Sequence, residues 1–269
     1  MTDAVQKLYE ISEALAAQRL GVERVEDTFN VSQGTGISAH KAHIDPLPFV
    51  ESLSAAADSR RRQIHGFASG IKHVLLEPKR SRANQWSFVD SAGRLVPTVQ
   101  SRDFVSGVGQ AAESPAWALP FVDDLFFVYL LELDMGLRVV TEDQVEFWGV
   151  SQDRITSAAR SLLYHKSRNL KFKPFDDDPL VHRMKAGDGL DAARCLVVGD
   201  LFYTEIGDGF RFSLPSPDHF LCTFDAAPES IQALQKKTNA VCEDQDYYLT
   251  NQIFRFDVGK PVPVEATRG

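Results

Sequence analysis

The sequence predicts an α+β fold: a mixed, largely antiparallel sheet with amphipathic helices packed on it. Two observations carry this prediction. Several runs of strand-forming residues are joined by short turns typical of hairpins. The helical patterns between them do not alternate regularly with strands, as they would in a doubly wound parallel sheet. The strongest pattern, Leu119–Asn169, combines a hairpin with a helix that has one apolar face.

The stretch Leu125–Leu133 is almost entirely apolar, which is typical of a strand covered on both faces, and it predicts the central strand. Gly136 supplies the turn, and Leu137–Val140 returns as the partner strand. Thr141 and Ser151 are candidate N-caps. After Ser151, apolar residues recur at helical spacing: Ile155, Ala158, Ala159, Leu162 and Leu163.

Further elements are expected on both sides of this stretch. Before it we expect a helix over Thr2–Arg19, strands over Val22–Val31 and Ile37–Ile44, a long helix from Phe49, a strand, turn and strand over Trp86–Gln100, and an irregular segment over Ser101–Pro115. After it we expect strands over Leu170–Phe175 and Leu180–Met184, a helix from Asp191 to about Tyr203, a hairpin over Phe210–Phe224, a helix over Pro228–Glu243 and a strand over Ile253–Val258. Pro97 favours an edge position or a bulge for its strand, because proline cannot donate a ladder hydrogen bond.

The polar connection Glu77–Asn84 predicts a boundary between two parts of the chain. We expect an N-terminal helix-strand-helix region over residues 1–84 and an α+β main domain over residues 85–269. One continuous domain is the alternative.

Charge and cysteine usage narrow the class of protein. A formal net charge of −8 and a pI near 5.4 argue against binding to nucleic acid or to an anionic membrane surface. The apolar run at Leu125 is too short to cross a bilayer as a helix, and the first residues lack the apolar region of a signal peptide. Three cysteines without close pairing (Cys195, Cys222 and Cys242) are typical of reduced thiols. We therefore expect a cytoplasmic protein without a membrane span.

Six segments carry a family resemblance: LVPTVQSRDF (Leu95–Phe104), LPFVDDLFFVYLLELDMGLRVVT (Leu119–Thr141), LLYHKSRNL (Leu162–Leu170), DGLDAARCL (Asp188–Leu196), FSLPSPDHFLC (Phe212–Cys222) and FDVGKPVPV (Phe256–Val264). In order and local sequence they resemble the YtpQ-like family of bacterial proteins, over roughly residues 95–264. Residues 1–94 match only in general layout. The resemblance implies a single cytosolic α+β unit, and it transfers no activity and no catalytic residue.

Three aspartates flank the predicted central strand. Asp123 and Asp124 precede it and Asp134 follows it. A carboxylate cluster at a strand end would suit the acid and base chemistry of a hydrolase or transferase, with or without a divalent ion. Aspartates beside strands are also common turn residues, so both interpretations stay open.

The densest positive charge is Arg60, Arg61 and Arg62. With Arg80 and Arg82 these arginines would form a face that binds a partner or an anion, because guanidinium groups pair well with carboxylates and phosphates. The alternative is a solvated helix face.

The other polar motifs favour structural roles. His40 and His43 would face opposite sides of a strand and lack further ligands at recognised spacing, so no metal site is predicted. Asp188 and Asp191, with Arg194 following, would hold a cation or polar ligand or, as capping favours, simply begin a helix.

Three further motifs lack the surroundings that their chemistry needs. Asp176–Asp178 lacks the spaced ligands of a calcium loop. Gly34, Gly36, Gly107 and Gly109 lack the setting of a phosphate-binding motif and are interpreted as flexible turns. Ser101 and the cysteines lack a nucleophile signature.

The sequence therefore predicts a non-enzymatic protein-interaction module, without cofactor or metal, that binds a protein partner through the Arg60–Arg62 face or through apolar surface residues. The rival hypothesis is an enzyme that uses Asp123, Asp124 and Asp134. A third hypothesis, a structural subunit of a larger assembly, predicts a broad apolar patch.

Overall fold

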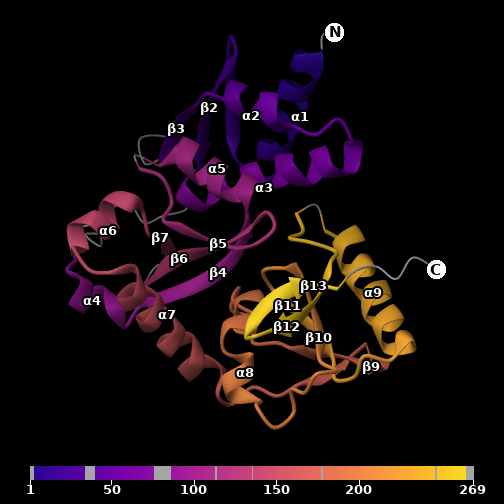
Figure 1. Cartoon of the computed structure of the whole chain (residues 1–269). Helices are drawn as coiled ribbons and strands as arrows, with labels where there is room; N and C mark the ends of the chain where they lie inside the picture. The colour runs from indigo at the N-terminus through magenta and orange to yellow at the C-terminus, as the bar shows by residue number, and fades with distance from the viewer. Residues whose placement is uncertain are drawn as a thin grey trace.

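The computed structural model describes residues 3–33, 40–75, 86–112, 114–134, 136–176, 178–245 and 247–264. It confirms the α+β class, because the strand pairings in these ranges are antiparallel and helices pack on the sheets. The described strands form a three-stranded sheet near the N-terminus, a four-stranded sheet in the middle of the chain and a six-stranded sheet toward the C-terminus. Figure 1 shows how these parts are arranged. Within the same ranges, no helix has the length and apolar character needed to cross a membrane.

The N-terminal sheet and its helices form the upper part of Figure 1. The strands are β1 (Gly21–Val25), β2 (Thr28–Gln33) and β3 (His40–Ile44), and the helices are α1 (Asp3–Ala17), α2 (Leu47–Ser52) and α3 (Ala57–Leu75). α1 and α3 bury apolar residues at helical spacing, as expected from the sequence.

Two expectations for this region are wrong. Val22–Val31 is a hairpin rather than one strand, because the chain turns at Glu26, which has a positive φ of 55°. The turn contains no glycine, so the sequence pattern does not indicate it. The helix expected from Phe49 is interrupted after α2. Leu53 is extended there, and the Ser54 hydroxyl accepts a hydrogen bond from the Ala56 amide, a local bond that competes with helix.

The middle sheet has β6 (Leu125–Leu133) as its central strand, as predicted. Along one edge β6 pairs with β4 (Leu95–Ser101), and along the other it pairs first with β5 (Ala118–Val122) and then with β7 (Gly136–Val139). Among the described strands β4 pairs with β6 alone, which confirms the edge position expected from Pro97. The helices of this part are α4 (Phe88–Ala92), α5 (Arg102–Ala111), α6 (Glu142–Trp148) and α7 (Gln152–Ser167).

Two further expectations are corrected here. The start of Trp86–Gln100 is not a strand, because Ser87 and Asp90 form a reciprocal capping box that begins α4. Ser101–Pro115 is not irregular. Ser101 caps α5 by accepting a hydrogen bond from the Phe104 amide, and Gly107 and Gly109 lie within that helix rather than in flexible turns.

The C-terminal sheet has the strand order β13-β12-β10-β11-β9-β8. Its strands are β8 (Lys173–Phe175), β9 (Asp178–Met184), β10 (Arg211–Ser216), β11 (His219–Thr223), β12 (Ile253–Asp257) and β13 (Lys260–Pro263). The helices are the 3-10 helix η3 (Ala192–Leu196), α8 (Val198–Leu201) and α9 (Pro228–Glu243). α9 packs on one face of this sheet, and phenylalanines of β10, β11 and β12 stack on the other. The predicted hairpin and the predicted helix over residues 228–243 are confirmed.

The two largest hydrophobic cores are formed by successive parts of the chain. One is formed by buried residues between Leu8 and Leu75, and the other by buried residues between Phe88 and Phe254. The predicted boundary falls within residues 76–85, which lie outside the described ranges, so the division into residues 1–84 and 85–269 stays a prediction. α5 packs against α3 and thereby joins the two parts.

Candidate functional site

The three strand-flanking aspartates do not lie together. Asp123 and Asp124 occupy the turn between β5 and β6, whereas Asp134 lies at the far end of β6. β6 has nine residues, and at about 3.3 Å per residue its ends are about 30 Å apart. Asp124 pairs with Arg62 at 2.9 Å, and Asp134 pairs with Arg94 at 3.3 Å. The structure therefore does not bring these carboxylates into one cluster.

Arg60, Arg61 and Arg62 do not form a single face, because consecutive residues of a helix point in different directions. The Arg60 guanidinium donates to Glu10 Oε2 at 3.0 Å. Arg62 donates to Asp124 and to the Leu249 carbonyl, at 2.9 and 2.8 Å. Arg80 and Arg82 lie outside the described residues.

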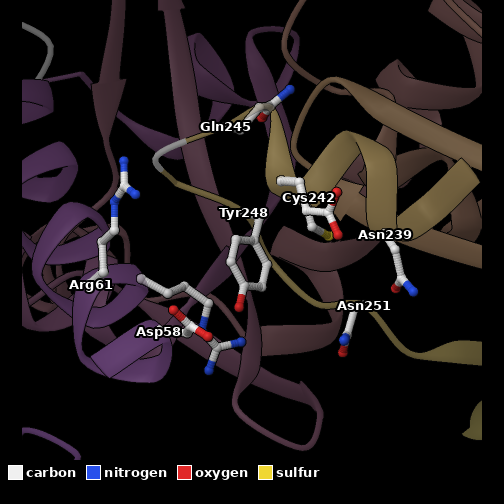
Figure 2. A pocket seen from close by; sticks show the side chains of 9 residues that line it. Asp58, Arg61, Asn239, Cys242, Gln245, Tyr248 and Asn251 are labelled. Atoms are coloured by element: carbon white, nitrogen blue, oxygen red, sulfur yellow. The ribbon is translucent and has the colours of Figure 1, made fainter. Parts of the chain in front are cut away.

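Arg61 and Arg62 line a polar pocket of about 410 Å³ between α3 and α9, which we call the α3–α9 pocket. Figure 2 shows its labelled side chains, which come from α3, from α9 and from the segment before β12. Its lining residues are Asp58, Arg61, Arg62, Asn239, Cys242, Glu243, Gln245, Tyr248 and Asn251. The pocket therefore presents carboxamide, guanidinium, phenol and carboxylate groups within one concave surface.

Local helix geometry positions the α9 side of the pocket. Leu234, Thr238 and Val241 are buried against the C-terminal sheet. Asn239 and Glu243 are four residues apart, so they lie on one helix face, and both line the pocket.

The segment between α9 and β12 is held at both sides of Tyr248. The hydroxyl of half-buried Tyr247 donates to Gln100 Oε1 at 2.9 Å and accepts from the Ser101 amide at 3.2 Å. The Leu249 amide donates to the Pro215 carbonyl at 2.8 Å. The Arg62 guanidinium lies 5.5 Å from the centre of the Tyr248 ring, a cation–π distance. Tyr248 is thus fixed as a wall of the pocket.

Cys242 lies against the pocket but is not set up as a nucleophile. It is buried, its thiol donates to the Thr250 carbonyl at 3.7 Å, and burial raises the pKa of this thiol to about 12. Thiolate is the reactive form of cysteine, so little of it is present near neutral pH. Cys195 and Cys222 are also free and buried, and burial raises the pKa of both.

Beside the pocket, Asp103 is a buried carboxyl group in the first turn of α5, with 6% of its surface exposed. Burial raises the pKa of Asp103 to about 6; Arg62 opposes the increase, and Asp124 adds to it. The charges of Arg62, Asp124 and Asp103 are therefore coupled where α3, α5 and the β5–β6 turn meet.

This coupling predicts a pH dependence of stability. The pKa of Asp103 lies above its ordinary value of 3.8, so the folded protein binds this proton more tightly than the unfolded chain. The contribution of Asp103 to the free energy of unfolding is then expected to fall by about 3 kcal/mol as pH rises from about 4 to about 6. Asp103→Asn should remove that decrease, which urea denaturation of both proteins across this range will measure.

The matched control is Asp153→Asn, because Asp153 occupies the same position after the N-cap serine of α7 but is exposed. It should keep the pH profile of the unchanged protein. A profile of Asp103→Asn that parallels the unchanged protein from about pH 4 to about pH 6 would contradict the assignment.

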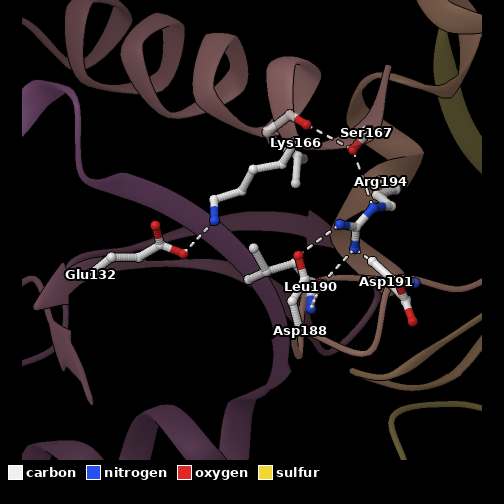
Figure 3. A network of polar contacts seen from close by, with 9 residues as sticks. Glu132, Lys166, Ser167, Asp188, Leu190, Asp191 and Arg194 are labelled. Carbon is white, nitrogen blue, oxygen red and sulfur yellow. Dashed lines mark hydrogen bonds and ion pairs between the residues drawn. The ribbon is translucent and has the colours of Figure 1, made fainter. Parts of the chain in front are cut away.

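The Asp188, Asp191 and Arg194 motif forms an internal ion-pair network (Figure 3). Arg194 is fully buried and donates to Asp188, to Asp191 and to the Ser167 hydroxyl, at 2.8 to 3.1 Å. Asp191 does not cap a helix, which corrects the expectation; its Oδ1 accepts from the Ala186 amide and from Arg194. The cation held by these aspartates is Arg194 itself.

The remaining candidate residues from the sequence have structural roles or lie outside the described residues. His43 bonds to Asn30 across the β2–β3 pair at 3.0 Å, and the His40 side chain lies outside the description. Asp176 has a positive φ of 50° in a turn and pairs with Lys237, while Asp177 is not described. In the described ranges, no group of three or more His, Cys, Asp or Glu is arranged to hold a metal ion.

No protein-family model, curated protein or solved structure matches this chain. The resemblance to the YtpQ-like family stays a prediction, and the site rests on geometry. Sequence reasoning singled out Arg61 and Arg62 but missed Asn239, Tyr248 and Asn251. Asn239 belongs to the polar side of a predicted helix, and the segment before β12 has no periodic pattern, so neither carries a local signal.

Proposed function

We propose that this chain is a non-enzymatic, cytosolic interaction protein that receives a polar segment of a protein partner in the α3–α9 pocket. The observation that carries the proposal is that Arg61, carboxamides and Tyr248, from α3, α9 and the segment before β12, line one pocket. Sites that bind a ligand lie preferentially where parts of a fold meet. The resemblance to YtpQ-like bacterial proteins belongs to the same proposal.

The chemistry of the lining suits a peptide more than a simple ion. Carboxamides such as Asn239 and Asn251 both donate and accept, as a peptide backbone requires. Asp58 and Glu243 place carboxylates in the same pocket as Arg61, so a segment with side chains of both signs is complementary to it. The Tyr248 ring supplies a rigid surface of the kind that is common in partner interfaces.

The rival hypothesis, a hydrolase or transferase, receives less support from the geometry. It requires Asp123, Asp124 and Asp134 to act together, and they lie at the two ends of β6. None of the three belongs to the lining of the α3–α9 pocket.

The proposal is tested by site-specific photo-cross-linking in the cells that make the protein. With p-benzoyl-L-phenylalanine in place of Tyr248, a discrete cross-linked product is expected, because that side chain lines the pocket. The same probe at Tyr203, which is 77% exposed and does not line the pocket, is the matched position and should not give that product.

Charge reversal within the pocket provides a second test of the same proposal. Arg61→Glu is expected to reduce the product formed at position 248 by at least about tenfold, a change typical of a disrupted interface contact. Lys171→Glu, an equal charge change at an exposed loop residue, should leave it unaltered. The proposal fails if no product forms at position 248, or if Arg61→Glu and Lys171→Glu behave alike.

A further inference from the structure

A second concave site, which we call the α7 groove, lies between α7 and the middle sheet. Its volume is about 450 Å³. Pro97, Leu119, Phe127 and Tyr129 line its sheet side, and Gln152 and Ser157 line its helix side. None of these residues contributes to the α3–α9 pocket.

Strand register explains why the sheet side is apolar and aromatic. Pro97 pairs with Tyr129, and Leu119 pairs with Phe127, so alternate residues of three strands share this face. The wall continues through neighbouring aromatic rings. Trp117 lies 4.6 Å from Tyr129, and Phe121 lies 4.3 Å from Phe127, measured between ring centroids. The groove is thus walled by flat ring surfaces and a proline.

The Tyr129 hydroxyl is the distinctive polar group of the groove. The Tyr129 side chain is only 3% exposed, and within the described part of the chain its hydroxyl makes no hydrogen bond to the protein. The hydroxyl is not among the fully buried polar atoms that lack a partner, so solvent in the groove reaches it. A hydroxyl at the wall of a groove bonds to water there, and an acceptor group of a ligand can replace that water. Burial also raises the pKa of Tyr129, so the hydroxyl keeps its proton and donates. Tyr129 lines the groove, so its hydroxyl can donate to an acceptor group on a ligand.

The charge of the groove defines the ligand further. Among its described lining residues Arg160 alone is charged, and Arg160 forms an ion pair with Asp200. The other polar residues of the rim, Gln152, Thr156 and Ser157, are neutral. An anionic or cationic ligand would lose hydration without gaining an unpaired counter-charge.

We propose that the α7 groove binds a neutral, planar small molecule whose polar group accepts a hydrogen bond from the Tyr129 hydroxyl. The ring surfaces contact the faces of the ligand, the hydroxyl fixes its orientation, and the neutral rim admits it without a charge requirement. A volume of about 450 Å³ falls within the usual range for small-molecule sites.

The test uses 2-naphthol, a neutral planar molecule with one hydroxyl group, and the full-length protein. Saturable binding with a stoichiometry of one is expected by isothermal titration calorimetry. Ser157→Trp fills the groove from an exposed helical position and should abolish binding. His165→Trp places the same side chain at an exposed position of α7 outside the groove, and it should bind as the unchanged protein does.

Tyr129→Phe separates a ligand-binding role from a structural one. It should weaken 2-naphthol binding by about tenfold, the size expected for one hydrogen bond, and should not lower the melting temperature, because the hydroxyl makes no hydrogen bond to the described part of the protein. The anionic analogue 2-naphthalenesulfonate should bind more weakly than 2-naphthol. The proposal is overturned if 2-naphthol does not bind saturably, if Ser157→Trp binds it unchanged, or if Tyr129→Phe lowers stability without affecting affinity.

Discussion

Replacing Arg194 by methionine is expected to lower the free energy of unfolding by about 3–5 kcal/mol, the usual effect of removing one partner of a buried ion pair. Arg194 and Asp191 are both fully buried, at 0% exposure. Without the guanidinium, the Asp191 carboxylate stays in the interior with backbone amides such as that of Ala186 as donors but without a counter-charge at 2.8 Å. The Ser167 hydroxyl also loses its contact with Arg194. Urea or guanidinium denaturation will measure the change.

The double variant Asp191→Leu with Arg194→Met is the informative control. It removes both buried charges, and apolar pairs of similar volume often replace such pairs at little cost. It is therefore expected to be more stable than Arg194→Met alone, although Asp188 keeps no guanidinium partner and is partly exposed. If the double variant were the less stable of the two, the loss would come from packing rather than from an uncompensated charge.

Gly107→Ala is expected to destabilise the protein by at least about 3 kcal/mol, the upper end of the effect of overpacking. A methyl group at Gly107 would overlap the carbonyl oxygen of Phe67, and one at Gly70 would overlap the carbonyl oxygen of Phe104. These obstacles are backbone atoms, which cannot rotate away as a side chain does. α3 and α5 must therefore move apart, and the contact between the two parts of the chain is expected to open. Thermal or chemical denaturation measures the loss.

Gly109→Ala provides the matched comparison within the same helix. A methyl group there meets no atom within 4 Å, and Gly109 is exposed. Because alanine favours helix over glycine, this substitution is expected to stabilise the protein by about 0.5–1 kcal/mol. The interpretation of the α3–α5 contact fails if Gly107→Ala and Gly109→Ala shift stability in the same direction.

The sequence by itself determined the elements whose pattern is local. The apolar run of β6, the turn at Gly136, the helical spacing in α7 and the hairpin of β10 and β11 depend on neighbouring residues, and each appears in the structure. Prediction from the sequence failed where no nearby residue indicated the backbone conformation. Glu26 turns the chain without a glycine, and Gly107 lies within a helix, where the absence of a side chain admits the close approach of α3.

Only the tertiary structure decided the candidate sites, because their residues are distant in the chain. Arg62 bonds to Leu249 across 187 positions, and this contact fixes one wall of the α3–α9 pocket. The separation of Asp124 from Asp134 follows from the length of β6 and its straight course through the sheet. No periodic pattern records that the Tyr129 hydroxyl faces the α7 groove and makes no hydrogen bond to the described protein, since hydrogen bonding depends on what the folded chain places around a group.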